Sequence, residues 1–365
     1  MKDFQIRNST KLLFRNDLSD DLANIIKSKK VLFIYGGGSV HKNGCYNDIK
    51  GSVLKGNGQF FEFKNASREA IDIEKGIKFS QLNNVDLLIG AGGGSVMDAT
   101  KIISLGHFNP NFLEILKEEK SLEEVKHLPF ILIPTYPSSG SENIGCAAVT
   151  KEGNFYFAYG LSAEYSFLVP KYSLSLNQEM TSYSSLTVIV QLSMVVFGDK
   201  NPISYDFGIS VIKNVLKAAI KLKTEPNDLK ARGVILFGAS ISTSELIAIE
   251  KDVDYSSDFY FLEIMLETLF NTTYRKALTS LFPAYLKHTA KLYENEVKTF
   301  LSDAFNFTGS VDDSINRLVQ LFNDFGIDLF FHEHFSEEIL LKIPNQSSFE
   351  IDQIKELFND MIKLK

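Results

Sequence analysis

Short apolar runs alternate with longer, mixed stretches along the first half of the chain. Each apolar run is of the length that a buried strand needs, and each intervening stretch has the composition of a helix. The runs are 31–35, 60–63, 85–89 and 130–133. The intervening helical stretches are 47–55, 67–82 and 95–105. This alternation predicts an α/β domain with a largely parallel sheet that helices cover on both faces.

The pattern changes after a predicted hairpin, in which residues 147–150 and 155–159 flank a polar turn. From about residue 178 the apolar positions follow helical spacing, with few turn signals. These stretches are 186–197, 208–222, 229–249, 261–269, 311–325 and 350–362. The chain of 365 residues is too long to fold around a single hydrophobic core of ordinary size. We therefore predict an α/β domain over residues 1–177 and an all-helical domain over residues 178–365.

Small, glycine-rich or polar segments follow three of the predicted strands, at 36–39, 92–95 and 135–142. In parallel sheets, ligands bind beyond the carboxyl ends of the strands, and glycine lets the backbone come close to them. The turn at 92–95 also opens a predicted helix, whose first amides attract anions. Taken by itself, that segment is also explained by a tight turn before a helix that Ser95 and Asp98 cap. Three such turns together predict a nucleotide or phosphate site.

Composition narrows the classes of function. A net charge of -7 argues against nucleic acid or an anionic membrane as the main partner. No apolar run is long enough to span a bilayer, and the first residues lack the apolar core of a signal peptide. Cys45 and Cys146 provide neither a disulfide framework nor a cysteine zinc site. We expect a cytoplasmic protein.

Several motifs together resemble one family, the iron-containing (group III) alcohol dehydrogenases, and within it the butanol-dehydrogenase-like branch. They are YGGGSVHKNG at 35–44, GGGSVMDATK at 92–101 and TYPSSGSE at 135–142. Met180-Thr181, LFPAY at 281–285 and residues 311–327 also match. The resemblance covers nearly the whole chain. It implies the dehydroquinate synthase-like architecture, a nicotinamide dinucleotide and a homodimer.

The resemblance also implies which residues would hold the dinucleotide. Gly93, Gly94 and Ser95 would bind its pyrophosphate, with Asp98 nearby. The other positions are Gly37, Gly38 and Ser39 for the adenosine ribose, Thr135, Tyr136 and Ser139 for the nicotinamide side, and Leu176 in the pocket wall. No acidic residue occupies 36–39, where a carboxylate would repel a 2′-phosphate. NADP is therefore favoured over NAD.

The family holds a divalent metal with one Asp and three His, and here the sequence departs from it. A gapless match from Met180 places Thr187 and Gln191 on the Asp-x-x-x-His pair, whose spacing shares one helix face. Counting back from LFPAY places Tyr260 and Tyr274 on the remaining positions. Hydroxyl, amide and phenol groups bind first-row metals poorly at neutral pH. We expect neither iron nor zinc.

Other candidate metal sites have simpler explanations. His288 is the single histidine between residues 178 and 300, and we expect it on the surface of a helix. His332-Glu333-His334 is interpreted as a solvated loop. The acidic segment 252–258 lacks the glycine of a calcium loop, since Ser257 stands there, and is interpreted as an acidic entry to a helix.

Three hypotheses of function remain open. The resemblance implies an NAD(P)-dependent oxidoreductase that interconverts alcohols and aldehydes, but the replaced ligands put its metal-dependent chemistry in doubt. A metal-independent enzyme on a polyol or sugar-like substrate would need another electrophile, for which Tyr260, Tyr274 and Arg275 are candidates. A catalytically silent dinucleotide-binding relative, or a subunit of a larger assembly, is the third. Packing in a phenylalanine-rich core would also explain the two tyrosines.

Overall fold

The computed structural model describes residues 3–4, 6–251, 255–327, 340 and 347–363. They form two compact units. The sheet unit comprises Ile6–Leu176 and Asn227–Ser244. The helical unit comprises Met1–Gln5, Asn177–Pro226 and Glu245–Lys365. The sequence analysis places residues 227–244 in the second domain, whereas the structure groups them with the sheet.

A six-stranded sheet forms the centre of the sheet unit, in the order β1-β8-β5-β4-β2-β3 with every neighbouring pair parallel. Its strands are β1 (Lys11–Phe14), β2 (Lys30–Tyr35), β3 (Gln59–Phe63), β4 (Leu87–Gly92), β5 (Phe130–Pro134) and β8 (Tyr165–Leu168). The predicted hairpin is present as β6 (Ala147–Lys151) and β7 (Asn154–Ala158), paired antiparallel. These findings confirm the predicted fold class, although β1 precedes the strand that the sequence analysis takes as the first.

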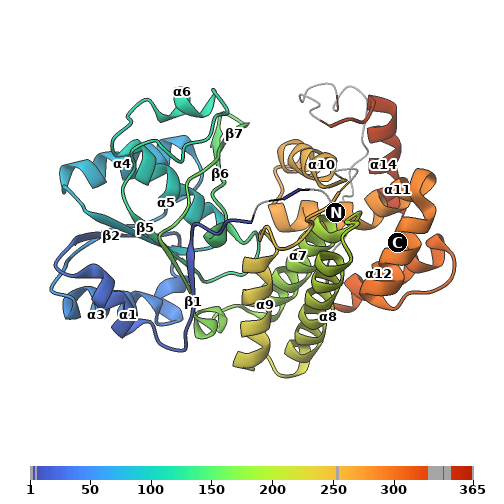
Figure 1. The fold of residues 1–365 in the computed structure, drawn as a ribbon, viewed down its shortest axis with the longest axis horizontal. Helices are drawn as coiled ribbons and strands as arrows, with labels where there is room; N and C mark the ends of the chain where they lie inside the picture. The colour runs from blue at the N-terminus through green and yellow to red at the C-terminus, as the bar shows by residue number, and fades with distance from the viewer. Residues whose placement is uncertain (1–2, 5, 252–254, 328–339, 341–346, 364–365) are drawn as a thin grey trace. The chain divides into compact units, whose positions relative to one another are not determined.

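Helices cover both faces of this sheet (Figure 1). Successive β2 residues alternate between two buried clusters, because strand side chains point to opposite faces. Leu32 and Ile34 pack in one cluster with the helices α4 and α5, and Val31 and Phe33 in the other with α1 and α3. The helices of this unit are α1 (Ser19–Ile26), α2 (Ser39–Lys42), α3 (Cys45–Lys55), α4 (Ala70–Leu82), α5 (Gly94–Gly106), α6 (Phe112–Leu116), α9 (Leu229–Ile241) and the 3₁₀ turns η1 (Ser141–Asn143) and η2 (Pro170–Ser173).

Helices make up the described part of the helical unit, apart from an isolated antiparallel bridge between Asp199 and Lys251. They are α7 (Gln178–Val196), α8 (Pro202–Thr224), α10 (Tyr255–Phe270), α11 (Tyr274–Phe305), α12 (Val311–Asp324) and α14 (Ile351–Lys363). Asn177 and Asn201 cap α7 and α8 by accepting backbone N–H groups. No helix among the described residues is both long and apolar enough to cross a membrane.

One predicted helix ends early, and a helix for which no extent was predicted crosses a proline. The stretch 229–249 is helical only to Ile241, and Ala248 beyond it has a left-handed backbone (φ 64°) that no helix accommodates. Conversely, α11 continues across Pro283, with its only non-helical residue at Tyr293. A proline usually ends a sequence-based helix prediction, but here Pro283 and its neighbours are fully buried and their packing maintains the helix.

Candidate functional site

The three polar turns follow neighbouring strands at one edge of the sheet. β4 is flanked by β2 and β5, with Tyr35 opposite Ala91 and Gly92 opposite Pro134. The chain leaves all three strands at these positions, so the turns at 36–39, 93–95 and 135–142 begin side by side. The backbone N–H of Thr135 donates to the Gly92 carbonyl at 2.9 Å. The structure thus brings together the segments that the sequence analysis selects.

The glycines around β4 serve two different purposes. A Cβ on Gly90 would lie 2.2 Å from Thr100 Oγ1, and one on Gly92 would lie 2.8 Å from Val96, so both let α5 pack closely on β4. A Cβ on Gly93 would meet its nearest atom at an ordinary 3.7 Å, and one on Gly37 would meet none within 4 Å. Packing therefore does not require glycine at these two positions, whereas close approach of a ligand would.

The N-terminus of α5 differs from its prediction. The helix begins at Gly94 with Gly93 as N-cap, and no side chain of the described residues caps it. The proposed capping box of Ser95 and Asp98 is therefore wrong. Asp98 instead accepts hydrogen bonds from Ser141 Oγ at 2.7 Å and from the Ala148 amide at 3.3 Å. Val96 and Met97 donate their amides to the Gly93 carbonyl, which leaves the earlier amides of Gly94 and Ser95 for another acceptor, as in helices that bind anions.

Lys101 lies one turn beyond Asp98 and is fully buried. Its ammonium group donates to Ser141 Oγ at 2.8 Å and to the carbonyls of Ile144 and Cys146 at 2.9 and 2.6 Å. Ser141 in turn donates to Asp98, so one hydroxyl joins the two charges. Burial lowers the pKa of Lys101 and raises that of Asp98. This network fixes the third turn to the helix that follows the second.

The third turn is also tied to α9. Gly140 has φ 68°, and a Cβ there would lie 2.4 Å from the Ala239 carbonyl, so the position requires glycine. Ser240 donates to the buried Glu142 carboxylate, and Asn143 donates to the Ser240 carbonyl at 2.9 Å. Burial raises the pKa of Glu142. Tyr136 and Ser139 lie in the same turn, and Ser139 Oγ is the atom nearest to a Cβ on Gly94, at 3.0 Å.

The four positions that the sequence analysis assigns to the family's metal ligands all lie in the helical unit, on three helices. Thr187 and Gln191 are buried and one turn apart on α7. Tyr260 lies on α10, and Tyr274 is the first residue of α11. Tyr274 donates its hydroxyl to Gln191 Oε1 at 3.2 Å.

This donor set does not suit a transition metal. Burial first, and then the neighbouring Tyr260, Glu263 and Glu267, raise the pKa of Tyr274 well above that of an ordinary phenol. Tyr274 therefore keeps its proton at neutral pH, and that proton occupies Gln191 Oε1. Within the described residues, no group of three or more His, Cys, Asp or Glu could hold an ion. We derive no chemical step through a metal.

Arg275 and His288, two residues that the sequence analysis discusses, also lie in this unit. Arg275 places its guanidinium 5.6 Å from the centre of the Tyr183 ring on α7, which is a cation–π contact. His288 is half-buried, with its ring edge-on to Phe349 at 5.2 Å, so the expected surface position is wrong. His332-Glu333-His334 and the start of the acidic segment 252–258 lie outside the described residues.

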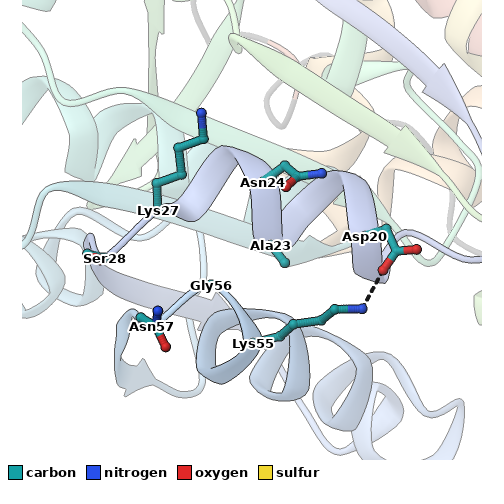
Figure 2. Close-up of a pocket in the computed structure, with 8 residues that line it drawn as sticks. All are labelled: Asp20, Ala23, Asn24, Lys27, Ser28, Lys55, Gly56 and Asn57. Atoms are coloured by element: carbon teal, nitrogen blue, oxygen red, sulfur yellow. Dashed lines mark hydrogen bonds and ion pairs between the residues drawn. The ribbon is translucent and has the colours of Figure 1, made fainter.

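A surface pocket of about 500 Å³ lies elsewhere on the sheet unit (Figure 2). It is formed where α1 and α3 end, and Lys27 and Gly56 there precede the amino ends of β2 and β3. An ion pair between Lys55 and Asp20 crosses one side of it. The three polar turns follow the opposite ends of the strands, so this pocket is not part of the candidate site.

The sheet unit therefore has the architecture of a doubly wound α/β nucleotide-binding fold, with a glycine turn between its central strand and the following helix. A sequence model of the family "Iron-containing alcohol dehydrogenase" matches residues 9–174. Over these residues the chain is similar to that family. The matched residues include all three polar turns, whereas the four positions that the sequence analysis assigns to metal ligands lie beyond residue 174.

Individual relatives extend the likeness over both units. The chain is 25% identical over 317 residues to "Probable NADH-dependent butanol dehydrogenase 2" of Bacillus subtilis, covering 84% of this chain and 80% of that protein. It is 23% identical over 354 residues to the NADPH-dependent aldehyde reductase YqhD of Escherichia coli, covering 92% and 89%. The crystal structure of NADH-dependent butanol dehydrogenase A from Thermotoga maritima shares its fold, with a TM-score of 0.89, 22% identity and 99% coverage of both chains.

Proposed function

We propose that the sheet unit binds a nicotinamide dinucleotide at the carboxyl edge of its sheet. The observation that supports this most directly is the uncapped start of α5 after Gly92, beside two further glycine or polar turns. Backbone N–H groups at a helix start, together with the helix dipole, favour the charge of a pyrophosphate. The names of the relatives include both NADH- and NADPH-dependent enzymes.

In this proposal each turn has a separate task. Gly93, Gly94 and Ser95 hold the pyrophosphate, and Thr135, Tyr136 and Ser139 lie toward the nicotinamide. The remaining positions are Gly37, Gly38 and Ser39 at the adenosine ribose, Asp98 near the pyrophosphate and Leu176 in the pocket wall. Asp98 acts by orienting Ser141. When bound, the nicotinamide supplies hydride transfer.

We also propose that NADP is preferred over NAD. The turn after β2 carries no carboxylate that would repel a 2′-phosphate, and the neighbouring His41 and Lys42 are exposed. Titration calorimetry with NADPH and NADH measures the preference, with tighter binding of NADPH expected. Tighter binding of NADH would contradict it and leave dinucleotide binding itself intact.

Gly93→Ala tests the proposed cradle. The new methyl group would meet only an ordinary contact with Tyr136, so the variant should fold normally. It would stand where the pyrophosphate approaches, and we expect affinity for both dinucleotides to fall by about 10-fold or more, which is roughly 1.4 kcal/mol. Gly51→Ala is the matched control, because it also adds a methyl group in open space but lies in α3. Unchanged affinity in Gly93→Ala would refute this assignment.

For activity, the replaced metal ligands favour a dinucleotide-binding protein without the family's metal-dependent alcohol and aldehyde interconversion. Oxidation of NADPH or NADH measured with a panel of aldehydes, with and without added Fe²⁺ or Zn²⁺, tests this. Turnover that depends on metal would contradict it. Turnover without metal would support an enzyme acting on an alcohol, polyol or sugar-like substrate by other groups, with Tyr260, Tyr274 and Arg275 as the candidates.

A further inference from the structure

We infer that a hydrogen-bonded polar core in the helical unit has taken over the cross-linking role of the family's metal ion. A coordinated metal links the helices that supply its ligands. In this chain three of the same four positions, Gln191, Tyr260 and Tyr274, supply side chains that interact directly with one another. The inference does not depend on dinucleotide binding, because every residue that carries it lies in the helical unit.

The interactions join three helices. Gln191 on α7 accepts the hydroxyl proton of Tyr274, the first residue of α11, at 3.2 Å. Tyr260 on α10 is hydrogen-bonded to Tyr274 as well. α7, α10 and α11 pack against one another pairwise. A single phenol therefore lies at the meeting point of the three helices.

A second contact strengthens the same junction. Arg275, next to Tyr274 at the start of α11, lies over the ring of Tyr183 on α7 at 5.6 Å. Tyr183, Thr187 and Gln191 follow one another at intervals of four residues, and they therefore share one face of α7. The start of α11 is thus attached to this face at two points, by Tyr274 and by Arg275.

The chemistry of this core opposes an ion. Neutral hydroxyl, phenol and amide groups donate and accept hydrogen bonds among themselves, whereas a first-row metal favours imidazole and carboxylate. An ion would have to displace the Tyr274 proton from Gln191 Oε1. The Thr187 hydroxyl is fully buried and has no hydrogen-bond partner among the described residues, so a valine should replace it without loss.

Metal analysis of the purified full-length protein is the first test. The chain is produced in medium supplemented with iron, zinc and magnesium salts, dialysed, and analysed by mass spectrometry of the elements. We expect metal far below one ion per chain, and a melting temperature that neither EDTA nor added Fe²⁺, Zn²⁺ or Mg²⁺ shifts. One ion per chain whose removal lowers the melting temperature would overturn the inference. Thr187→Val should leave both readouts unchanged.

A double-mutant cycle tests the proposed link itself. Tyr274→Phe and Gln191→Met should each lower the melting temperature, and the double variant should lose no more than the more sensitive single variant, since both remove one interaction. Losses that add would show that the two residues act separately and would overturn the inference. Should a variant fail to fold, the metal analysis of the unaltered chain still decides. Loss of dinucleotide binding in the sheet unit would affect neither test.

Discussion

The ammonium group of Lys101 lies in a site without solvent exposure. Such a group is stable only where the protein replaces the water that it loses. Three oxygen atoms accept its hydrogen bonds, and Asp98 balances its charge through Ser141. One acceptor, Ser141, lies in the third polar turn, and the other two are carbonyls just after it, so the residue fixes the path of the chain there.

Replacing Lys101 by methionine should therefore destabilise the sheet unit strongly. The variant keeps the volume of the side chain but leaves the partly buried Asp98 carboxylate without its cation. Breaking a buried pair in this way costs about 3–5 kcal/mol. Urea unfolding measures the loss. Lys120→Met, at an exposed lysine, should change stability by about 0.5 kcal/mol or less. A similar small loss in both variants would contradict the structural role of Lys101.

At the scale of single residues, the sequence predicted some contacts and not others. The turns at 36–39, 92–95 and 135–142 were predictable, because glycine and small polar residues after buried strands have a local cause. The partner of Asp98 was not. Its predicted role as a cap depended on three-residue spacing, whereas its actual donor, Ser141, is 43 residues away. The hydrogen bond between Tyr274 and Gln191 joins residues 83 positions apart, so no local pattern in the sequence predicted it.

Among the elements, β4 and α5 pack closely because residue 90 is a glycine. Gly90→Ala would place a methyl group 2.2 Å from Thr100 Oγ1. Gly90 and Thr100 are both buried, so the helix must move away from the strand. We expect a loss of about 1–3 kcal/mol, as is typical of overpacking. Adding Thr100→Ala should recover part of it in urea unfolding, because the closest atom is removed. No recovery would mean that the contact is not the cause.

Elements with a local signal were predicted well, and those fixed by distant pairing were not. β2, β5 and the hairpin follow apolar runs and turns that any short window contains. β1 has only four residues, and its pairing with β8 more than 150 residues later makes it a strand. Similarly, α11 crosses Pro283 because buried neighbours support it, and the helix predicted at 229–249 ends early where the chain turns at Ala248.

At the scale of the whole molecule, the sheet unit is discontinuous in sequence. α9, from residues 227–244, belongs to it. Arg232 of α9 donates to the Ser173 carbonyl, and Ser240 donates to Glu142. A boundary at residue 177, which the change from alternating to helical spacing predicts, would therefore cut the unit.

A fragment of residues 1–177 should accordingly fail to melt cooperatively. Without α9, the buried Glu142 carboxylate loses its hydroxyl donor and the edge near η2 is uncovered. Fusing residues 227–244 to the fragment through a flexible linker should restore a cooperative transition in circular dichroism. A fragment that melts cooperatively without this segment would show that α9 is dispensable for the sheet.

The late position of α9 in the sequence also affects the order of folding during synthesis on the ribosome. Domains usually fold in the order in which they leave the exit tunnel, the N-terminal one first. Here the sheet cannot complete its final contacts until Ser244 has left the tunnel, and α7 and α8 of the other unit leave it earlier because they precede α9. For that interval the nascent chain carries a nearly finished sheet and a pair of helices that still lacks its later partners α10 and α11. Chaperones that bind exposed apolar helices would act on the nascent chain during this interval, before either unit has finished folding.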